Sequence, residues 1–524
     1  SELFWRCCGA ALAPLWPGCR GNQTQFRLCL QDYVEPIYFY IGTVFGLQAV
    51  CVTALFVCSW VMSGTCVAGM LAVSWFVLNR QDATRVEQGI PLRENWALPY
   101  FSVQVAALTG FLSNNISSAS EMFCYLTMSA STFTFLLLWE HGHYVLFVQG
   151  LCLFLLDSLD LVPQRKTADI NKIYLSSLVL VYLFQFQNSA LLASPLLCLL
   201  IGSAVARSFQ RKMRMGPLLA RVMKLLLHFH LVFTAGISFA YLIKKLSPVG
   251  SSDFTLKLLE VKFGLNTTTD FVTNFLLCQD GLRAAGQNLF LRLTQTSVLP
   301  FYVLVLAVCL LSTLQTVCRK LRSTANHQSL ILSTAVPTII GFSLWREYYP
   351  RVLADLADLQ EFYDPDTTEL IGWIRSQAPA VFAGSPLLLG TIKLCSGSAV
   401  TSLPIYSDMD LLRRSEETYQ VYSMRSAEDV YKCLTAQKTT YVIVEESICN
   451  DVQLKKGCRL KDLLDVSNRH VVHDGSRMFS SSKHGRFCQE VKMNYSPYTN
   501  YFTRVFWNRS YHVYKVNSVI SFQF

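Results

Sequence analysis

Four charged side chains of both signs stand close together on one polar stretch of an otherwise apolar sequence. The stretch spans residues 79–101, NRQDATRVEQGIPLRENWALPYF, and the four residues are Arg85, Glu87, Arg93 and Glu94. Pro91 and Pro99 fix their own φ angles and lack backbone N–H groups, which predicts a stiff loop. A stiff loop that presents guanidinium groups at a membrane surface suits the charged head group of a lipid. The alternative is a connecting loop whose charges are merely solvated.

Other ionisable residues lie near the ends of apolar runs. In WEHGHYVLF, a His/Glu group of Glu140, His141 and His143 could bind a metal or move protons, but positions i and i+2 do not share a helix face. We interpret this group as a solvated helix cap, and Asp157 and Asp160 as polar helix ends. Three acids of segment 244–296 could act on a substrate, and their spacing selects none of them: Asp253, Glu260 and Asp270.

Signatures of metal and cofactor sites are absent from the sequence. No CxxC pair or Cys/His cluster has the spacing of a zinc site. No Gly-rich phosphate loop, HExxH or GxSxG motif occurs either. We therefore expect no metal and no bound cofactor.

The composition predicts a polytopic α-helical membrane protein. Hydrophobic residues make up 52% of the 524 residues and charged residues only 15%, more apolar surface than one core could hide. Apolar runs of about 20 residues, the length that crosses a bilayer, recur along the chain. The expected spans are 37–60, 62–79, 97–113, 122–139, 143–162, 170–188, 189–206, 222–243, 297–318 and a weaker 329–344. The pair on either side of residue 188 has almost no linker, which favours a re-entrant or broken-helix hairpin.

Lysine and arginine indicate how these spans are oriented. Segment 206–224 carries six cations and no acid, and segments 163–166 and 318–322 are also basic. Such loops stay in the cytoplasm, which explains the net charge of +10 better than nucleic-acid binding does. Segments 1–36, 80–96, 140–142, 244–296 and the chain after about residue 345 then fall on the lumenal side.

Glycosylation sequons allow a check on this orientation. Four of the five sequons fall on the predicted lumenal side, at Asn22, Asn266, Asn494 and Asn508, and only Asn115 falls on the cytoplasmic side. We expect glycans at Asn266, Asn494 and Asn508, and a bare Asn115. This pattern favours the endoplasmic-reticulum membrane, including the nuclear envelope.

The chain changes character after about residue 345. We expect a lumenal remnant over 1–36, a multi-span transmembrane domain of about ten helices over 37–344, and a lumenal α/β domain over 345–524. Short β-type runs alternate with helical patterns over 373–448, which predicts the α/β domain. In an oxidising lumen, a disulfide between Cys449 and Cys458 is compatible with the sequence.

Several motifs together resemble one known family. TRVEQGIPLRENWALPYF resembles the TRV…PLRE segment of the dumpy-nineteen-like family, the tryptophan C-mannosyltransferases. WIRSQAPAVFAGSP, YSMRSAEDVYKCL, YVIVEES and KKGCRLKDLLDV are similar to the lumenal domain of that family in order and spacing. The C-terminal stretch GRFCQEVKMNYSPYTNYFTRVFWNRSYHVYKVNSVISFQF is similar to the fourth paralogue of the family. The resemblance covers nearly the whole chain.

The resemblance implies a GT-C type membrane glycosyltransferase of the endoplasmic reticulum. Such an enzyme takes mannose from dolichyl-phosphate-mannose and attaches it to indole C2 of tryptophan in WxxW motifs of secretory proteins. The partners implied are the membrane lipid donor and those acceptor proteins, with no nucleic acid and no cofactor besides the donor. Arg85 and Arg93 then become phosphate-binding residues, and Glu94 or Glu87 would orient them.

The sequence also departs from the family pattern. It opens at Ser1, and the resemblance implies that an upstream span and first lumenal loop carry the catalytic acid, so no catalytic residue is assigned within this chain. The segment from Arg322 to Gln360 is shorter than in relatives, and Leu403 stands before Pro404 where relatives have a histidine. These departures keep an alternative open, a catalytically inactive membrane scaffold or anchoring protein with the same fold. A transporter is a weaker alternative, because no inverted repeat is visible.

Overall fold

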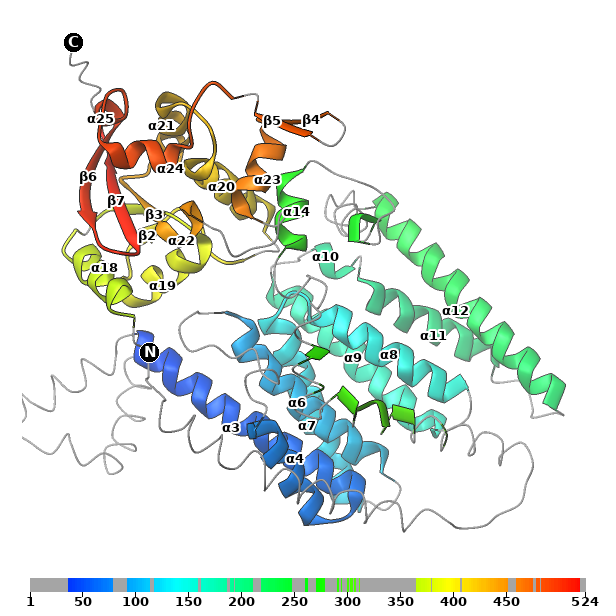
Figure 1. Ribbon diagram of the computed structural model, residues 1–524. Helices are drawn as coiled ribbons and strands as arrows, with labels where there is room; N and C mark the ends of the chain where they lie inside the picture. The colour runs from blue at the N-terminus through cyan, green and yellow to red at the C-terminus, as the bar shows by residue number, and fades with distance from the viewer. Residues whose placement is uncertain are drawn as a thin grey trace, which may run out of the picture.

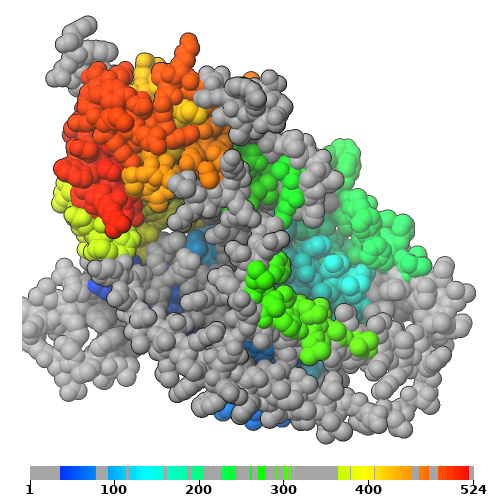
Figure 2. Space-filling model, in the orientation of Figure 1, coloured from blue at the N-terminus to red at the C-terminus, as the bar shows by residue number. Residues whose placement is uncertain are grey.

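The computed structural model describes residues 36–78, 92–113, 117–246 and 364–518 with short gaps, and parts of 260–311. Long helices from the first half of the chain pack side by side (Figure 1). The C-terminal residues form a separate lobe of strands and shorter helices, which lies above the helices in the view of Figure 2. The molecule therefore has a helical part and a C-terminal α/β part.

The helical part follows the apolar runs of the sequence. Its helices are α3 (Pro36–Ser63), α4 (Cys66–Leu78), α6 (Glu94–Leu112), α7 (Ser118–Leu138), α8 (Gly142–Ser158), α9 (Gln164–Phe184), α10 (Ser189–Leu192), α11 (Pro195–Gln210) and α12 (Leu218–Leu246). Two of them, α3 and α7, are long and apolar enough to cross a membrane. The structure describes only part of the expected span at 297–318. Residues 1–35 and the expected span at 329–344 lie outside the described residues.

Two helix starts, those of α9 and α11, lie farthest from the expected spans, at six residues each. α9 begins at Gln164 rather than near residue 170, because Arg165 and Lys166 are good helix formers that extend the helix beyond its apolar run. α11 begins at Pro195 rather than near residue 189, because proline is tolerated in the first turn of a helix and not in its interior. The short helix α10 occupies the connection, so α9 and α11 are separate helices.

Polar contacts between helices show which helix ends lie together. Asn95 Nδ2 donates a 2.8 Å hydrogen bond to the Tyr40 hydroxyl, so the first turns of α6 and α3 are adjacent. Lys166 Nζ donates to Phe111 O at 2.6 Å, which places the start of α9 beside the end of α6. These contacts make α3 and α6 parallel to each other and antiparallel to α9.

Glycine permits the closest approach between α11 and α12. A Cβ atom at Gly202 would lie 2.6 Å from the Val232 carbonyl oxygen, and one at Gly236 would lie 3.4 Å from the Cys198 carbonyl oxygen. Residue 202 thus lies opposite residue 232, and residue 198 lies opposite residue 236. The two helices therefore run antiparallel. Small residues at such contacts are typical of helices that pack within membranes.

The C-terminal part is built on a five-stranded mixed sheet. The strand order is β2 (Ala399–Val400), β1 (Val381–Ala383), β3 (Tyr441–Glu445), β7 (Tyr511–Val516) and β6 (Phe502–Trp507). β1 pairs in parallel with β2 and β3, whereas β7 pairs antiparallel with β3 and β6. A separate hairpin consists of β4 (Val471–Asp474) and β5 (Arg477–Ser480). The parallel half of the sheet and its helices match the alternation predicted for 373–448.

Helices cover both faces of this sheet (Figure 1). They are α18 (Pro365–Arg375), α19 (Pro386–Ser396), α20 (Met409–Tyr419), α21 (Ala427–Ala436), α22 (Glu446–Cys449), α23 (Leu460–Ser467), α24 (Phe487–Glu490) and α25 (Tyr498–Tyr501), with 3₁₀ turns at Gln420–Tyr422 and Val491–Met493. Successive residues of a strand face opposite sides. On β3, Val442 and Val444 join the core beneath α20 and α21, while Ile443 joins the core beneath α18 and α19.

One helix from the middle of the chain belongs to the core of the C-terminal part. Helix α14 (Phe271–Leu277) lies in the segment between α12 and residue 364, yet its Phe271, Val272 and Leu276 are buried among side chains of α20, α21 and β3. Asp270 caps the helix by accepting a 3.0 Å hydrogen bond from Thr273 N. Helix α14 and the C-terminal part therefore lie on the same side of the helices.

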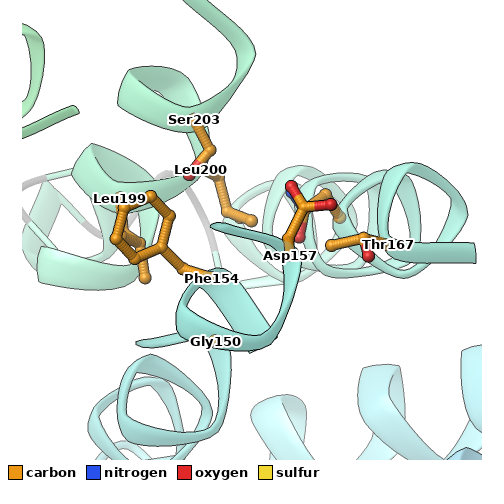
Figure 3. A pocket seen from close by; sticks show the side chains of 8 residues that line it. Gly150, Phe154, Asp157, Thr167, Leu199, Leu200 and Ser203 are labelled. Carbon is orange, nitrogen blue, oxygen red and sulfur yellow. The ribbon is translucent and has the colours of Figure 1, made fainter. Parts of the chain in front are cut away.

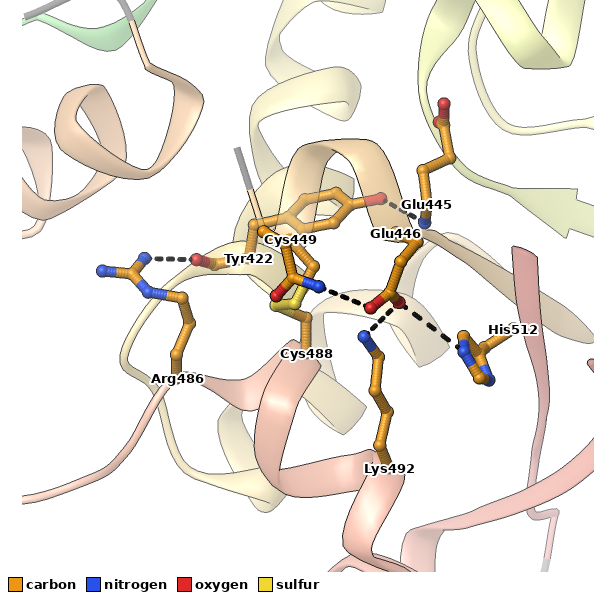
Figure 4. The surroundings of a disulfide bond; sticks show 9 residues. Tyr422, Glu445, Glu446, Cys449, Arg486, Cys488, Lys492 and His512 are labelled. Atoms are coloured by element: carbon orange, nitrogen blue, oxygen red, sulfur yellow. Dashed lines mark hydrogen bonds and ion pairs between the residues drawn. A yellow bond between two sulfur atoms is a disulfide. The ribbon is translucent and has the colours of Figure 1, made fainter. Parts of the chain in front are cut away.

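A disulfide joins two helices of the C-terminal part, and it is not the predicted one. Cys449 at the end of α22 is bonded to Cys488 in α24, with the two Cα atoms 6.1 Å apart (Figure 4). The predicted Cys449–Cys458 pairing is therefore wrong, and Cys458 lies outside the described residues. The reason is the fold: both Cys449 and Cys488 are buried in the same core cluster, although 39 residues separate them in sequence.

Candidate functional site

The candidate site lies where several helix ends meet, around Arg93. Arg93 directly precedes α6, and its Nη1 donates a 3.1 Å hydrogen bond to Glu140 Oε2 in the turn between α7 and α8. The arginine side chain is 49% exposed and that of Glu140 is 19% exposed. A guanidinium has five N–H donors, and this ion pair uses one. Arg93 thus presents a positively charged fork at a fixed point of the surface.

Aromatic and amide contacts hold the start of α6 in place. The side chain of Asn95 is buried and bonded to Tyr40, as described above. The ring of Trp96 stacks on that of Tyr40, with centroids 6.4 Å apart, and contacts Phe39 at 6.1 Å. Helix α19 of the C-terminal part contacts α3. The end of the helical part that carries Arg93 therefore faces the C-terminal part.

The turn that carries Glu140 is also rich in aromatic rings. Trp139 packs edge-on against the His141 ring at 6.1 Å, and the His143 ring lies 4.0 Å from that of Tyr144. His143 is buried, whereas His141 is exposed. The two histidines therefore differ in burial, and the interpretation of the group as a solvated helix cap is wrong for His143, whose side chain is buried. Among the described residues no group of three His, Cys, Asp or Glu side chains could hold a metal ion.

The four charged residues that were predicted to lie on one loop have different positions in the structure. Arg93 is exposed and paired with Glu140 rather than with Glu94. Glu94 lies in the first turn of α6, where a carboxylate is favoured by the helix dipole. Arg85 and Glu87 lie outside the described residues. The structure thus brings Arg93 together with a glutamate that the sequence pattern did not connect to it.

A buried polar network lies deeper among the same helices. Gln104 Nε2 donates to Gln149 Oε1 at 3.1 Å and to the Tyr174 hydroxyl at 3.2 Å. The Tyr174 hydroxyl donates to Gln149 Oε1 at 2.7 Å, and Gln149 Nε2 donates to Gln104 Oε1 at 3.1 Å. The network joins α6, α8 and α9. Its only signal in the sequence is the presence of two glutamines within apolar runs.

The acidic candidates of segment 244–296 are not gathered at Arg93. Asp270 caps α14 and lies near Glu416 of α20, on the C-terminal part. Burial is the main cause that raises the pKa of the Glu416 carboxyl, and the Asp270 carboxylate raises it further, against the hydrogen bond from Ser467. Glu260 is exposed, and Asp253 lies outside the described residues. Asp270 is thus explained by helix capping.

The sequons differ in how their asparagines are placed. Asn494 is exposed and adopts the left-handed conformation with φ 55°, which asparagine tolerates. Asn508 is tied into the turn between β6 and β7, where its Nδ2 donates to Asp366 O at 2.9 Å. Asn22, Asn115 and Asn266 lie outside the described residues. Glycosylation at Asn266, Asn494 and Asn508 remains a prediction.

Comparison with known proteins identifies relatives over nearly the whole chain. The family model described as "Dpy19: Q-cell neuroblast polarisation" matches residues 11–330 and 327–516. The human protein named "Probable C-mannosyltransferase DPY19L4" is 50% identical over 568 residues, which cover 94% of this chain and 78% of the relative. The "C-mannosyltransferase dpy-19" of Caenorhabditis briggsae is 23% identical over 544 residues, covering 93% of this chain and 78% of the relative.

The helices of the helical part expose large apolar side chains, as expected of a membrane protein. This feature is compatible with the relatives named above. The resemblance inferred from the sequence motifs is confirmed. This chain belongs to the Dpy19 family.

Proposed function

We propose that the chain is a C-mannosyltransferase of the endoplasmic-reticulum membrane. It would move mannose from dolichyl-phosphate-mannose to tryptophan C2 in WxxW motifs of secretory proteins. The names of its relatives support the transfer of mannose. The observation that carries the assignment of a site is the Arg93–Glu140 pair, at the end of the helices that faces the C-terminal part.

The proposed chemistry gives Arg93 a role at the leaving group. In the transfer, the bond from mannose C1 to the phosphate oxygen breaks, a bond from C1 to indole C2 forms, and the C2 proton leaves. Dolichyl phosphate departs with increased negative charge, which a guanidinium with paired donors can stabilise. Glu140 would keep that guanidinium oriented by accepting one N–H. No residue of this chain is assigned as the acid or base of the reaction.

The proposed topology is a multi-pass membrane protein with a lumenal C-terminal part. Three features support it: the antiparallel helix pairs, the cationic segments at 163–166 and 206–224, and the association of α14 with the C-terminal part. Glycan mapping of the expressed protein by endoglycosidase shift tests this arrangement. We expect Asn494 to be modified and Asn115 to be bare. Modification of Asn115 together with a bare Asn494 would reverse the orientation.

Binding of dolichyl phosphate to detergent-purified variants tests the role of Arg93. Arg93→Ala should weaken binding about tenfold or more, since a hydrogen bond to a charged group contributes roughly 1.5–3 kcal/mol. Arg93→Lys should recover only part of the affinity, because an ammonium keeps the charge and loses the planar fork. Lys172→Ala is the matched control. It also removes a cation from an ion pair, which Lys172 forms with Asp169 on α9. Equal affinity in Arg93→Ala and wild type would remove Arg93 from the site.

A catalytically inactive scaffold is the other outcome that the same preparation can reveal. Such a protein would be stable in detergent and would form no C-mannosyltryptophan on a WxxW peptide. The names of the relatives favour the transferase.

A further inference from the structure

A small pocket lies between α8, α9 and α11, with Asp157 and Leu200 among the residues that line it (Figure 3). Its volume of about 10 Å³ is room for about one water molecule. The indole ring of a tryptophan and the mannose ring of a lipid donor are both much larger than a water molecule. This pocket therefore holds neither substrate of the proposed reaction.

Aromatic rings gather one helical turn away from Arg93. The centroid of the Trp96 ring lies 6.1 Å from that of Phe39 and 6.4 Å from that of Tyr40, on which it stacks. Trp96 N donates a 3.1 Å hydrogen bond to Arg93 O, as in a helical turn. Side chains three positions apart on a helix are neighbours, so Trp96 lies beside Arg93. Phe39, Tyr40 and Trp96 together form an aromatic cluster.

The aromatic cluster is held on its inner side and exposed on its outer side. Tyr40 is only 6% exposed, and its hydroxyl accepts the hydrogen bond from the buried Asn95. Trp96 is partly buried, whereas Phe39 is 47% exposed. Rings that are already held in place lose little conformational freedom when a ligand packs against them, so the cluster is preorganised for binding.

The aromatic cluster lies at the end of the helices that faces the C-terminal part. Helix α19 contacts α3, and Figure 1 shows the start of α3 beneath α18 and α19. In the proposed topology this end lies on the lumenal side, where the acceptor proteins are. A lumenal peptide would therefore reach the cluster without crossing the apolar interior of the bilayer.

The proposed reaction limits where the acceptor indole can lie. Arg93 would hold the phosphate, and mannose C1 is bonded to an oxygen of that phosphate. Because the new bond joins C1 to indole C2, the indole must lie about one sugar ring away from the guanidinium. Helix residues three positions apart have Cβ atoms about 5–6 Å apart, so Trp96 and the Phe39 ring that it contacts lie in that neighbourhood.

We propose that Phe39 and Trp96 bind the indole ring of the acceptor tryptophan, an inference that rests on the proposed function. Aromatic rings attract one another in offset or edge-to-face arrangements with centroids about 4.5–7 Å apart, and the exposed Phe39 ring offers such a contact. Mannose suits the cluster less well, because its hydroxyl groups need hydrogen-bond partners and a phenyl ring has none. Phe39 and Trp96 thus form the acceptor site, and no proton transfer is assigned to them.

Binding of a synthetic WxxW peptide to the detergent-purified protein tests the acceptor site without any measurement of mannose transfer. Phe39→Ala should weaken binding about three- to tenfold, since one aromatic pair contributes about that factor besides the area that it buries. Phe39→Tyr keeps the ring and should bind like the wild type. Phe39→Leu keeps an apolar side chain and should still lose affinity. If Phe39→Ala does not fold, Phe39→Leu decides the question.

Phe45→Ala is the matched control. Phe45 is 49% exposed on the same helix, and six positions separate it from Phe39, so the two side chains do not share a face. Its replacement removes an equally exposed ring and should leave the affinity for the peptide unchanged. A peptide with alanine at both tryptophan positions is the ligand control, and Phe39→Ala should not alter its weaker binding.

Failure of the acceptor site and failure of the proposed function give different results. Dolichyl phosphate should bind to Phe39→Ala as tightly as to the wild type, because Arg93 is unchanged. If the wild type binds the peptide through its tryptophans and Phe39 but transfers no mannose, the acceptor site stands and the transferase assignment falls.

Three results would overturn the acceptor site. Equal affinity of the wild type for the tryptophan and alanine peptides would show that the protein does not recognise indole. Equal affinity of Phe39→Ala and the wild type for the WxxW peptide would place the indole elsewhere. An equal loss of affinity in Phe45→Ala and Phe39→Ala would assign the effect to the apolar surface as a whole.

Discussion

Arg93 Nη1 and Glu140 Oε2 lie 3.1 Å apart, although 47 positions separate the two residues in sequence. The pair connects the residue before α6 to the turn between α7 and α8. Since the arginine side chain is half exposed, water screens the attraction, and the pair serves to position the guanidinium more than to stabilise the fold.

The stability of the fold should depend little on this pair. A double-mutant cycle of Arg93→Ala and Glu140→Ala should give a coupling free energy of about 0.2–1 kcal/mol, the range of exposed ion pairs. Unfolding of the purified variants by denaturant measures it. A coupling above about 3 kcal/mol would mean that the pair is a structural element, and its part in ligand binding would need another explanation.

Replacement of Gln104 should destabilise the helical part. Gln104→Leu removes a partner from both Gln149 and Tyr174, whose polar atoms then stay buried among helices. We expect a loss of about 1–2 kcal/mol, the size of hydrogen bonds between membrane helices. The unfolding temperature in detergent measures the loss, with Gln164→Leu, at the first position of α9, as the control. An unchanged unfolding temperature in Gln104→Leu would argue against the network.

The disulfide makes a prediction about both chemistry and stability. Peptide mapping without reduction should recover a linked peptide that contains Cys449 and Cys488. Cys488→Ser should lower the stability of the C-terminal part by about 2–5 kcal/mol, as is typical for loss of a native disulfide. Cys433→Ser removes a free thiol of the same part and should have a smaller effect. A peptide that links Cys449 to Cys458 would restore the pairing expected from sequence.

Glu416 should make the C-terminal part less stable as the pH rises. Its pKa is raised in the folded state, mainly by burial, so the folded protein binds the proton more tightly than the unfolded chain does. The stabilisation that this proton provides is present below the ordinary glutamate pKa of about 4.3 and is lost as the pH rises through the folded pKa. Glu416→Gln should flatten that part of the stability profile.

The control for this prediction is Glu428→Gln, because Glu428 is an exposed partner of Lys432 on α21. Stability profiles of the three proteins against pH, measured by denaturant unfolding, provide the comparison. A profile of Glu416→Gln that parallels the wild type would show that another group causes the pH dependence.

The sequence predicted local elements better than it predicted pairings. Apolar runs located α3, α4, α6, α7, α8 and α12 within a few residues, since these helices are apolar along most of their length. The starts of α9 and α11 differ from the expected ones. Polar helix formers extend α9 at its start, and Pro195 sets the start of α11. The β-type runs and helical pattern of 373–448 likewise predicted the α/β character of that part.

Contacts between distant segments could not be read from the same patterns. Glu140 as the partner of Arg93, and Cys488 as the partner of Cys449, depend on how helices pack. The contribution of α14 to the C-terminal core was hidden for the same reason, because its seven residues are too short to give a periodic signal. Asp157 was interpreted as a polar helix end, and only the packing of α8, α9 and α11 showed the pocket beside it.

Formation of C-mannosyltryptophan on a synthetic WxxW peptide tests the proposed function most directly. Purified protein is incubated with dolichyl-phosphate-mannose, and the product is measured by mass spectrometry. We expect product from the wild type and from Lys172→Ala, and at least about tenfold less from Arg93→Ala, since loss of 1.4 kcal/mol of transition-state stabilisation is a factor of ten. No product from a well-folded wild type, or wild-type rates from Arg93→Ala, would contradict the account.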